Sequence, residues 1–208
     1  MGHAIQTNAS YPDKPLSRRL SSQLPIFILC LAVLQSCSLF APREPEDPID
    51  EAGTFLQPDT PEQVIENIQA AIAELNTPNY GRSINAELVF TPTATAAALD
   101  PSIWSSWSQI QEQQYFSTMA AAAQFGINHE LRLNDQTVSI ISDTRYVLDA
   151  SYTLNINHNR PDAPKVVQGR LIWVITQGED GLWSLSEWTD RELGASPSWS
   201  EVKSGFVK

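Results

Sequence analysis

The chain has 208 residues, 42% of them hydrophobic, and carries 24 acidic side chains against 13 Lys and Arg, a formal net charge of −11 at pH 7. This length suits one domain with additional segments. The acidic balance argues against binding nucleic acid or anionic lipid through charge, since both need a basic surface. Both cysteines, Cys30 and Cys37, lie near the N-terminus, so the rest of the chain can form no disulfide, catalytic thiolate or cysteine–metal site.

The N-terminal segment has the three parts of a secretory signal. Lys14, Arg18 and Arg19 precede the apolar run 24–34, and small residues follow it. The run has 11 residues, well short of the roughly 20 that a membrane-spanning helix needs. Its ending, Leu-Gln-Ser-Cys over residues 34–37, resembles the lipobox of bacterial prolipoproteins.

That resemblance implies a lipoprotein signal peptide over residues 1–36, cut before Cys37, with lipid on the Cys37 thiol and a fatty acyl group such as palmitate on its amino group. The protein is then exported to the bacterial cell envelope, and Ser38, rather than an Asp, favours the outer membrane. Two alternatives stay open. One is that the run is a buried core strand or helix that ends in Cys by chance. The other concerns only the start of the signal peptide, because translation from Leu16 or Leu20 would leave the lipobox intact.

Residues 37–59 are predicted to form an acidic, proline-rich tether. Without the leader, 10 basic side chains (13 − 3) stand against 23 acidic ones (24 − 1), a net charge near −13. Proline and like charges favour an extended, semi-stiff spacer. Membrane contact must therefore come from the acyl chains on Cys37.

A domain begins sharply at residue 60, where Thr60, Pro61 and Gln63 form a capping box with proline at the first helical position. The helix they open has an apolar face made of Val64, Ile65, Ile68, Ala71, Ile72 and Leu75. A short helix around 79–85 and a brief strand over 87–91 follow. A third helix is predicted from about Ser102 to Ala123, with a stripe of Trp104, Trp107, Gln111, Tyr115, Thr118, Met119 and Ala122.

The remainder indicates a sheet, with strands over 128–134, 145–158, 165–177 and 182–192. The second alternates most clearly, with Tyr146, Leu148, Ala150, Tyr152, Leu154 and Ile156 on one side. In the last strand Trp188 is out of phase with Trp183, which predicts a β-bulge near Ser186. Residues 194–208 are weakly patterned and are interpreted as a tail. Trp199 in this tail is a candidate partner or pocket-rim contact, although packing back onto its own domain is the favoured interpretation.

The order of elements resembles the nuclear transport factor 2-like superfamily, the cystatin-like α+β cone that also includes SnoaL-like proteins. The likeness is carried by the opening 60–65 with Tyr80 and Phe90, by the hairpin of 145–158 with 166–176, and by the ending Leu-Trp-Ser-Leu-Ser-Glu-Trp-Thr-Asp at 182–190. It implies N-terminal helices packed on a curved antiparallel sheet over residues 60–193. A cystatin-like sheet with another strand order is the alternative.

The superfamily includes ketosteroid isomerases and polyketide cyclases, which act inside the cone with an acidic or His base and an acid or Tyr as oxyanion partner. The predicted cavity lining is Tyr80, Trp104, Trp107, Tyr115, Tyr146, Tyr152 and Trp173. Asp149 has outward parity and Asp100 is expected to cap a helix, so we predict no catalytic acid–base pair. His129 and His158 are predicted to be surface loop residues, without metal. No cofactor is expected.

These observations favour a non-enzymatic, lipid-anchored module that binds an envelope protein or a small apolar ligand, and no nucleic acid. An isomerase- or cyclase-like enzyme that uses the cone cavity is the alternative, and a purely structural envelope component is a third. Ile172 and Val174, apolar on the outer face of the strand over 165–177, would suit a homodimer through the sheet.

Overall fold

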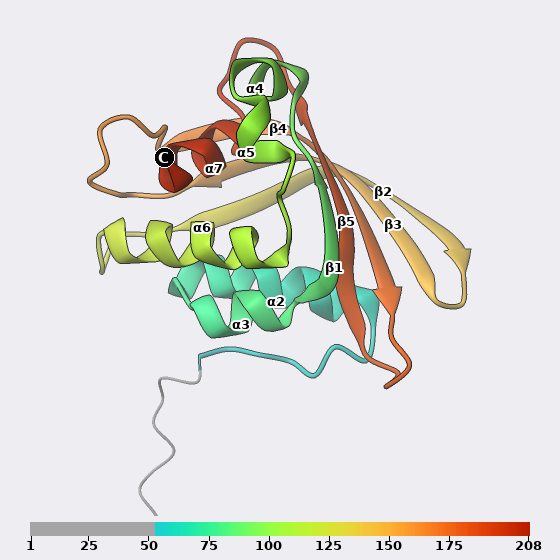
Figure 1. Ribbon diagram of the computed structural model, residues 1–208. Coiled ribbons are helices and arrows are strands. Elements are labelled where there is room, and N and C mark those ends of the chain that lie inside the picture. Colours follow the sequence, from blue (N-terminus) through green and yellow to red (C-terminus); the bar gives the residue numbers. More distant parts are fainter. Residues whose placement is uncertain (1–52) are drawn as a thin grey trace, which may run out of the picture. The chain divides into compact units, whose positions relative to one another are not determined.

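The computed structural model describes residues 53–208, so the predicted signal peptide, Cys37 and most of the tether lie outside the described residues. A five-stranded sheet in the order β1-β5-β4-β3-β2 curves past a group of helices that cover one of its faces (Figure 1). Its strands are β1 (Ile84–Thr91), β2 (Glu130–Ser142), β3 (Arg145–Asn155), β4 (Val166–Gln177) and β5 (Trp183–Glu192). β1 pairs parallel with β5, and the other pairs are antiparallel.

The helices come mainly before the long strands. They are α2 (Pro61–Glu74), α3 (Thr77–Arg82), α4 (Ala94–Leu99), α5 (Pro101–Trp104), α6 (Gln109–Ala122) and α7 (Trp199–Val207). The predicted α+β class, with early helices packed on a curved sheet, is confirmed, and the sheet is antiparallel except for the parallel pair of β1 and β5. Within residues 53–208 no helix is long and apolar enough to cross a membrane.

Helix α2 begins as its capping box predicts. The Gln63 backbone N–H donates to the Thr60 hydroxyl, and the Gln63 side chain accepts from the Thr60 N–H at 2.9 Å. The helix ends at Leu75, whose φ of 56° places it in the left-handed region. Its apolar face is buried, as the helical spacing indicates.

The single helix predicted over 102–123 is wrong, because the chain breaks after α5 and restarts at α6. Ser108 is the new N-cap, and its backbone N–H donates to the Gln111 side chain at 3.2 Å. Starting the helix at Gln109 rotates the predicted stripe. Gln111 and Thr118 are only half-buried, and the buried side is Glu112, Tyr115, Phe116, Met119 and Ala120.

The strand predictions hold best where apolar and polar residues alternate. All six predicted inward residues from Tyr146 to Ile156 are buried. The bulge is confirmed, because Val174 pairs with Glu187 while Ile175 pairs with Leu185, which leaves Ser186 as the extra residue. The homodimer predicted through Ile172 and Val174 on the outer face of the sheet stays a prediction. Within the single chain Val174 is already buried and Ile172 is half-buried.

The weakly patterned tail forms helix α7, which belongs to the core. Trp199, Val202, Lys203 and Phe206 are almost fully buried, so the favoured interpretation of Trp199, packing onto its own domain, is confirmed. The helix lies against the layer of the other helices and the sheet (Figure 1).

The two histidines do not lie on the surface, and this corrects the sequence prediction. His158 is fully buried and pairs its Nε2 with the Pro164 carbonyl at 3.2 Å, while its ring packs on Phe206. His129 is buried and accepts from the Asn157 N–H at 3.2 Å through Nδ1. Backbone groups near strand ends need partners, and an imidazole supplies both a donor and an acceptor.

Candidate functional site

Polar and charged side chains gather at two places, the closed interior of the cone and an open cleft at one edge. The interior centres on Glu112 of α6 and Lys203 of α7, whose side chains form an ion pair with no solvent exposure. The Tyr80 hydroxyl donates to Glu112 Oε1 at 2.8 Å, and Trp107 Nε1 donates to Oε2 at 2.7 Å. A buried carboxylate is tolerable only with such partners.

The Lys203 ammonium lies between aromatic faces. Its Nζ is 3.6 Å from the ring centroids of both Phe90 and Trp188. These cation–π contacts replace part of the lost hydration. Burial nevertheless lowers the pKa of Lys203 to about 8, although the Glu112 carboxylate acts in the opposite direction.

A second polar group lies beside the first. The Tyr152 hydroxyl donates to Asp190 Oδ1 at 2.7 Å, and the Ser200 N–H and hydroxyl donate to Oδ2 at 2.8 and 2.6 Å. Burial raises the pKa of Asp190, and burial and the Asp190 charge raise the pKa of Tyr152. Gly169 makes this arrangement possible, because a Cβ there would lie 2.5 Å from the Tyr152 hydroxyl oxygen.

Most of the predicted lining residues meet in this interior. Tyr80, Trp107 and Tyr152 belong to the two polar groups described above. Tyr115 accepts from Trp199 Nε1 at 2.9 Å, and burial raises its pKa. Trp173 is fully buried against Trp188. Helix α7 occupies the space toward which these side chains point. None of these side chains lines either of the two clefts described below.

Tyr146 stands apart from that cluster, whereas Trp104 lies at its edge, with its ring centroid 5.0 Å from that of Trp107. Tyr146 is six residues from Tyr152 along β3, about 20 Å at strand spacing. Its pKa is raised by burial and by Glu62 of α2, so the two tyrosines do not share one pocket. Trp104 is half-buried and donates Nε1 to the Ala96 carbonyl at 3.0 Å.

Both aspartates set aside in the sequence lie where predicted. Asp149 points outward and pairs with Arg170 at 2.6 Å. Asp100 is the N-cap residue of α5, accepts from the Ser102 hydroxyl at 2.8 Å, and forms an ion pair with Lys208.

The charged members of the interior are absent from the predicted set, although two carry a signal. Lys203 falls on the same helical face as Trp199, Val202 and Phe206, and Glu112 falls three residues before Tyr115. A charge on an apolar stripe indicates a buried pair, but the partner of each lies in a distant segment.

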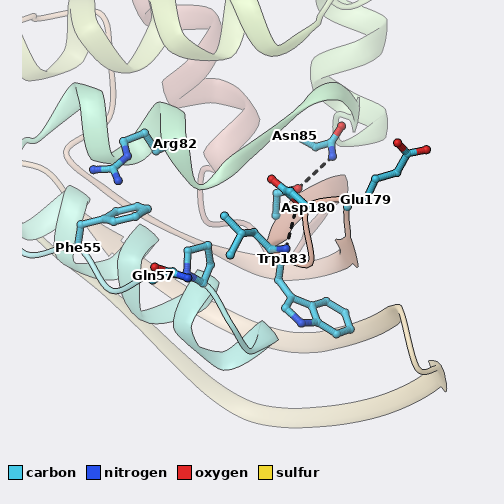
Figure 2. Close-up of a pocket in the computed structure, with 11 residues that line it drawn as sticks. Phe55, Gln57, Arg82, Asn85, Glu179, Asp180 and Trp183 are labelled. Carbon is cyan, nitrogen blue, oxygen red and sulfur yellow. Dashed lines mark hydrogen bonds between the residues drawn. The ribbon is translucent and has the colours of Figure 1, made fainter.

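The open cleft has a volume of about 880 Å³ and is lined by three segments of the chain. The segment before α2 supplies Phe55, Gln57 and Pro58. Arg82 comes from the end of α3 and Asn85 from the start of β1. The third wall is the β4–β5 turn with the start of β5, which supplies residues 178–184 except Gly181. Figure 2 shows Arg82 over Phe55 on one side and Glu179 and Asp180 on the other.

Two hydrogen bonds fix the walls of this cleft. Asn85 Nδ2 donates to Ser184 Oγ at 3.0 Å, and Asp180 Oδ1 accepts from the Leu182 N–H at 3.1 Å (Figure 2). The Arg82 guanidinium stacks 3.7 Å from the Phe55 ring centroid. Within residues 53–208 neither Arg82 nor Glu179 has an ion-pair partner, and Arg82 Nη1 donates to Asn79 Oδ1 at 3.4 Å.

No group of three or more His, Cys, Asp or Glu side chains among the described residues is arranged to hold a metal ion. The lining of the cleft includes no His or Cys, and its one hydroxyl belongs to Ser184 and is engaged by Asn85. The cleft offers charged, amide and ring groups for contact.

Comparison with known proteins adds the fold context. No protein-family model matches the sequence, and no curated protein matches it. A nuclear transport factor 2-like protein from Cytophaga hutchinsonii is 12% identical with a TM-score of 0.48, covering 67% of this chain and all (100%) of its own. One of unknown function in nutrient uptake from Rhodospirillum rubrum is 10% identical with a TM-score of 0.47, covering 62% and 95%.

A third structure, a protein of unknown function with a cystatin-like fold from Nostoc punctiforme, is 10% identical with a TM-score of 0.44, covering 65% of this chain and 90% of its own. Likenesses at these identities and scores carry no argument about function, which must come from the residues themselves.

We predict strong coupling between Glu112 and Lys203. Glu112→Gln should lower the free energy of unfolding by about 3–5 kcal/mol, because it leaves a buried ammonium without a counter-charge. Glu112→Gln combined with Lys203→Met should cost clearly less than the two single changes together. Urea unfolding measures this double-mutant cycle. The exposed pair Arg132–Glu130 is the matched control and should show little or no coupling, because solvent screens it. Additive costs at Glu112 and Lys203 would refute the prediction.

Stability should also rise with pH above about 8. The folded state holds Lys203 with a pKa of about 8, below the roughly 10.4 of an unfolded lysine, so the unfolded state binds more protons in this window. The free energy of unfolding of the unmodified protein should therefore increase between pH 8 and pH 10. Lys203→Met should show no such increase. An equal pH dependence in both proteins would contradict the assignment.

Proposed function

We propose that this protein is a lipid-anchored component of the bacterial cell envelope, held at a membrane through Cys37 and favoured for the outer membrane, whose domain binds a small ligand or a partner segment. The lipobox-like ending at residues 34–37 supports the anchor. The open cleft beside Arg82, next to an interior closed by α7, carries the binding function.

An enzyme acting inside the cone is the weaker candidate. It needs an acid and a base that reach a substrate. The interior acids, Glu112 and Asp190, are buried and engaged by Lys203, tyrosines and backbone groups. Withdrawal of α7 would expose Trp199 and Phe206, both large apolar side chains, so opening the interior is costly.

The cleft supports a ligand with two charges. Arg82 offers a planar guanidinium, which suits a carboxylate, and Glu179 offers a carboxylate for an amino group. Its volume of about 880 Å³ falls in the range of small-molecule sites, roughly 300–1,000 Å³. We therefore assign the ligand to small zwitterions such as short peptides.

The first prediction concerns the anchor. Intact-mass analysis of the membrane fraction should show a chain that starts at Cys37 and carries acyl groups. Cys37→Ala should leave the domain folded and the precursor without lipid. A wild-type protein without acyl mass, or one cut elsewhere and released, would overturn the anchor.

The second prediction concerns the cleft. Trialanine at 100-fold excess over its Kd should raise Tm by about 5 °C or more, and its C-terminal amide should lose most of that effect. Arg82→Met should abolish the shift. Arg160→Met is the matched control, since Arg160 also lies over a phenylalanine ring, that of Phe206. Equal shifts in both variants, or none in the unmodified protein, would refute the assignment.

A further inference from the structure

The loop between α6 and β2 presents two large apolar side chains to solvent. Phe125 is 84% exposed and Ile127 is 44% exposed, with Gly126 between them at a φ of +80°. The left-handed conformation of Gly126 turns the chain at this point. Residues 124–128, Gln-Phe-Gly-Ile-Asn, carry no charge although the domain is strongly acidic. We call the pair Phe125 and Ile127 the apolar tip.

The base of this loop is held firmly. The Gln124 N–H donates to the Asn157 carbonyl at 2.8 Å. His129 bridges the two ends, because its Nε2 pairs with the Gln124 carbonyl at 3.1 Å while its Nδ1 accepts from the Asn157 N–H at 3.2 Å. The buried histidine thus presents the apolar tip in one place, which lowers the entropic cost of using it for contact.

The apolar tip lies where the described chain begins. A small cleft of about 330 Å³ is lined by both tip residues together with Ala73, Glu74 and Leu75 at the end of α2. The Glu74 carboxylate accepts from the Thr54 N–H at 2.8 Å. The end of α2 thus contacts both the start of the described chain and the cleft that the apolar tip lines.

The length of chain before this point brings a bilayer within reach. Cys37 lies 16 residues before Gly53 (53 − 37), at most about 55 Å of extended chain. We infer that the apolar tip inserts into the interfacial region of the membrane that holds Cys37. This inference rests on the proposed lipid anchor and adds a second, protein-mediated contact to it.

The physical chemistry favours a lipid surface over other occupants. The acidic domain is repelled by anionic headgroups, so a loop without charge can approach them at a lower electrostatic cost. Two apolar side chains alone give weak membrane affinity. Once Cys37 is anchored the contact is intramolecular, and a weak interaction suffices to orient the domain.

The proposed mature chain offers a clean test, because lipid on the thiol of Cys37, its one cysteine, leaves an introduced cysteine as the only free thiol. Lipidated Ile127→Cys protein, labelled with an environment-sensitive fluorophore, is reconstituted into vesicles of phosphatidylethanolamine and phosphatidylglycerol that contain brominated lipid. Leu99→Cys is the matched control. Leu99 is 74% exposed at the end of α4, which Figure 1 shows on the other side of the fold from α2 and α3.

Brominated lipid should quench the label at residue 127 several-fold more than the label at residue 99, and adding Phe125→Ser should reduce that quenching. Equal quenching at both positions, in protein whose mass shows lipid on Cys37, overturns the inference and leaves the anchor standing. Absence of lipid mass overturns both. A label at 127 that responds to protein concentration without vesicles shows a second copy on the tip, which also overturns the inference.

Discussion

The buried ammonium of Lys203 is the constraint on which the interior depends. A charge removed from water must be paired and hydrogen-bonded, and the counter-charge, Glu112, stands on a different helix. The rings that face the ammonium, Phe90 and Trp188, come from β1 and β5. Helix α7 therefore fits in one position, with the core closed around it. That position also brings the Trp199 amide to the Tyr152 hydroxyl at 2.7 Å.

The polar side chains of the closed interior are engaged with one another. The same residue types that would serve an acid–base enzyme here satisfy one another, with Tyr80 and Tyr152 each donating to a carboxylate. Two buried indole N–H groups, of Trp173 and Trp188, have no hydrogen-bond partner within residues 53–208, so even this interior is not fully satisfied. Among the described residues, the surface offers the Arg82 guanidinium, which has no ion-pair partner, and the exposed ring of Phe125.

Local patterns predicted the parts of the fold that depend on local physics. The capping box at Thr60, the alternation of β3 and the bulge at Ser186 each follow from a few neighbouring residues. The missed starts of α6 and α7 have local signals, the capping boxes at Ser108 and Ser198. Other misses depend on distant contacts, since the burial of α7 rests on the pairing of Lys203 with Glu112, which is 91 residues away in sequence. His129 is buried because backbone groups of Gln124 and Asn157 need its ring, and no spacing rule reveals that.

The segment that enters the domain links the proposed anchor to the folded unit. Asn67 of α2 holds Leu56 by two hydrogen bonds of 2.7 Å, donating to its carbonyl and accepting from its N–H, as a neighbouring strand would. The Trp183 N–H then donates to the Pro58 carbonyl at 2.8 Å, which joins the segment to β5. Phe55 lies between Thr54 and the hydrogen-bonded residues Leu56 and Pro58. The segment 54–58 is therefore held along its length, and it forms one wall of the cleft. It begins at the end of α2, next to the cleft that the apolar tip lines. A contact of the tip with the bilayer would thus fix the orientation of the cleft as well.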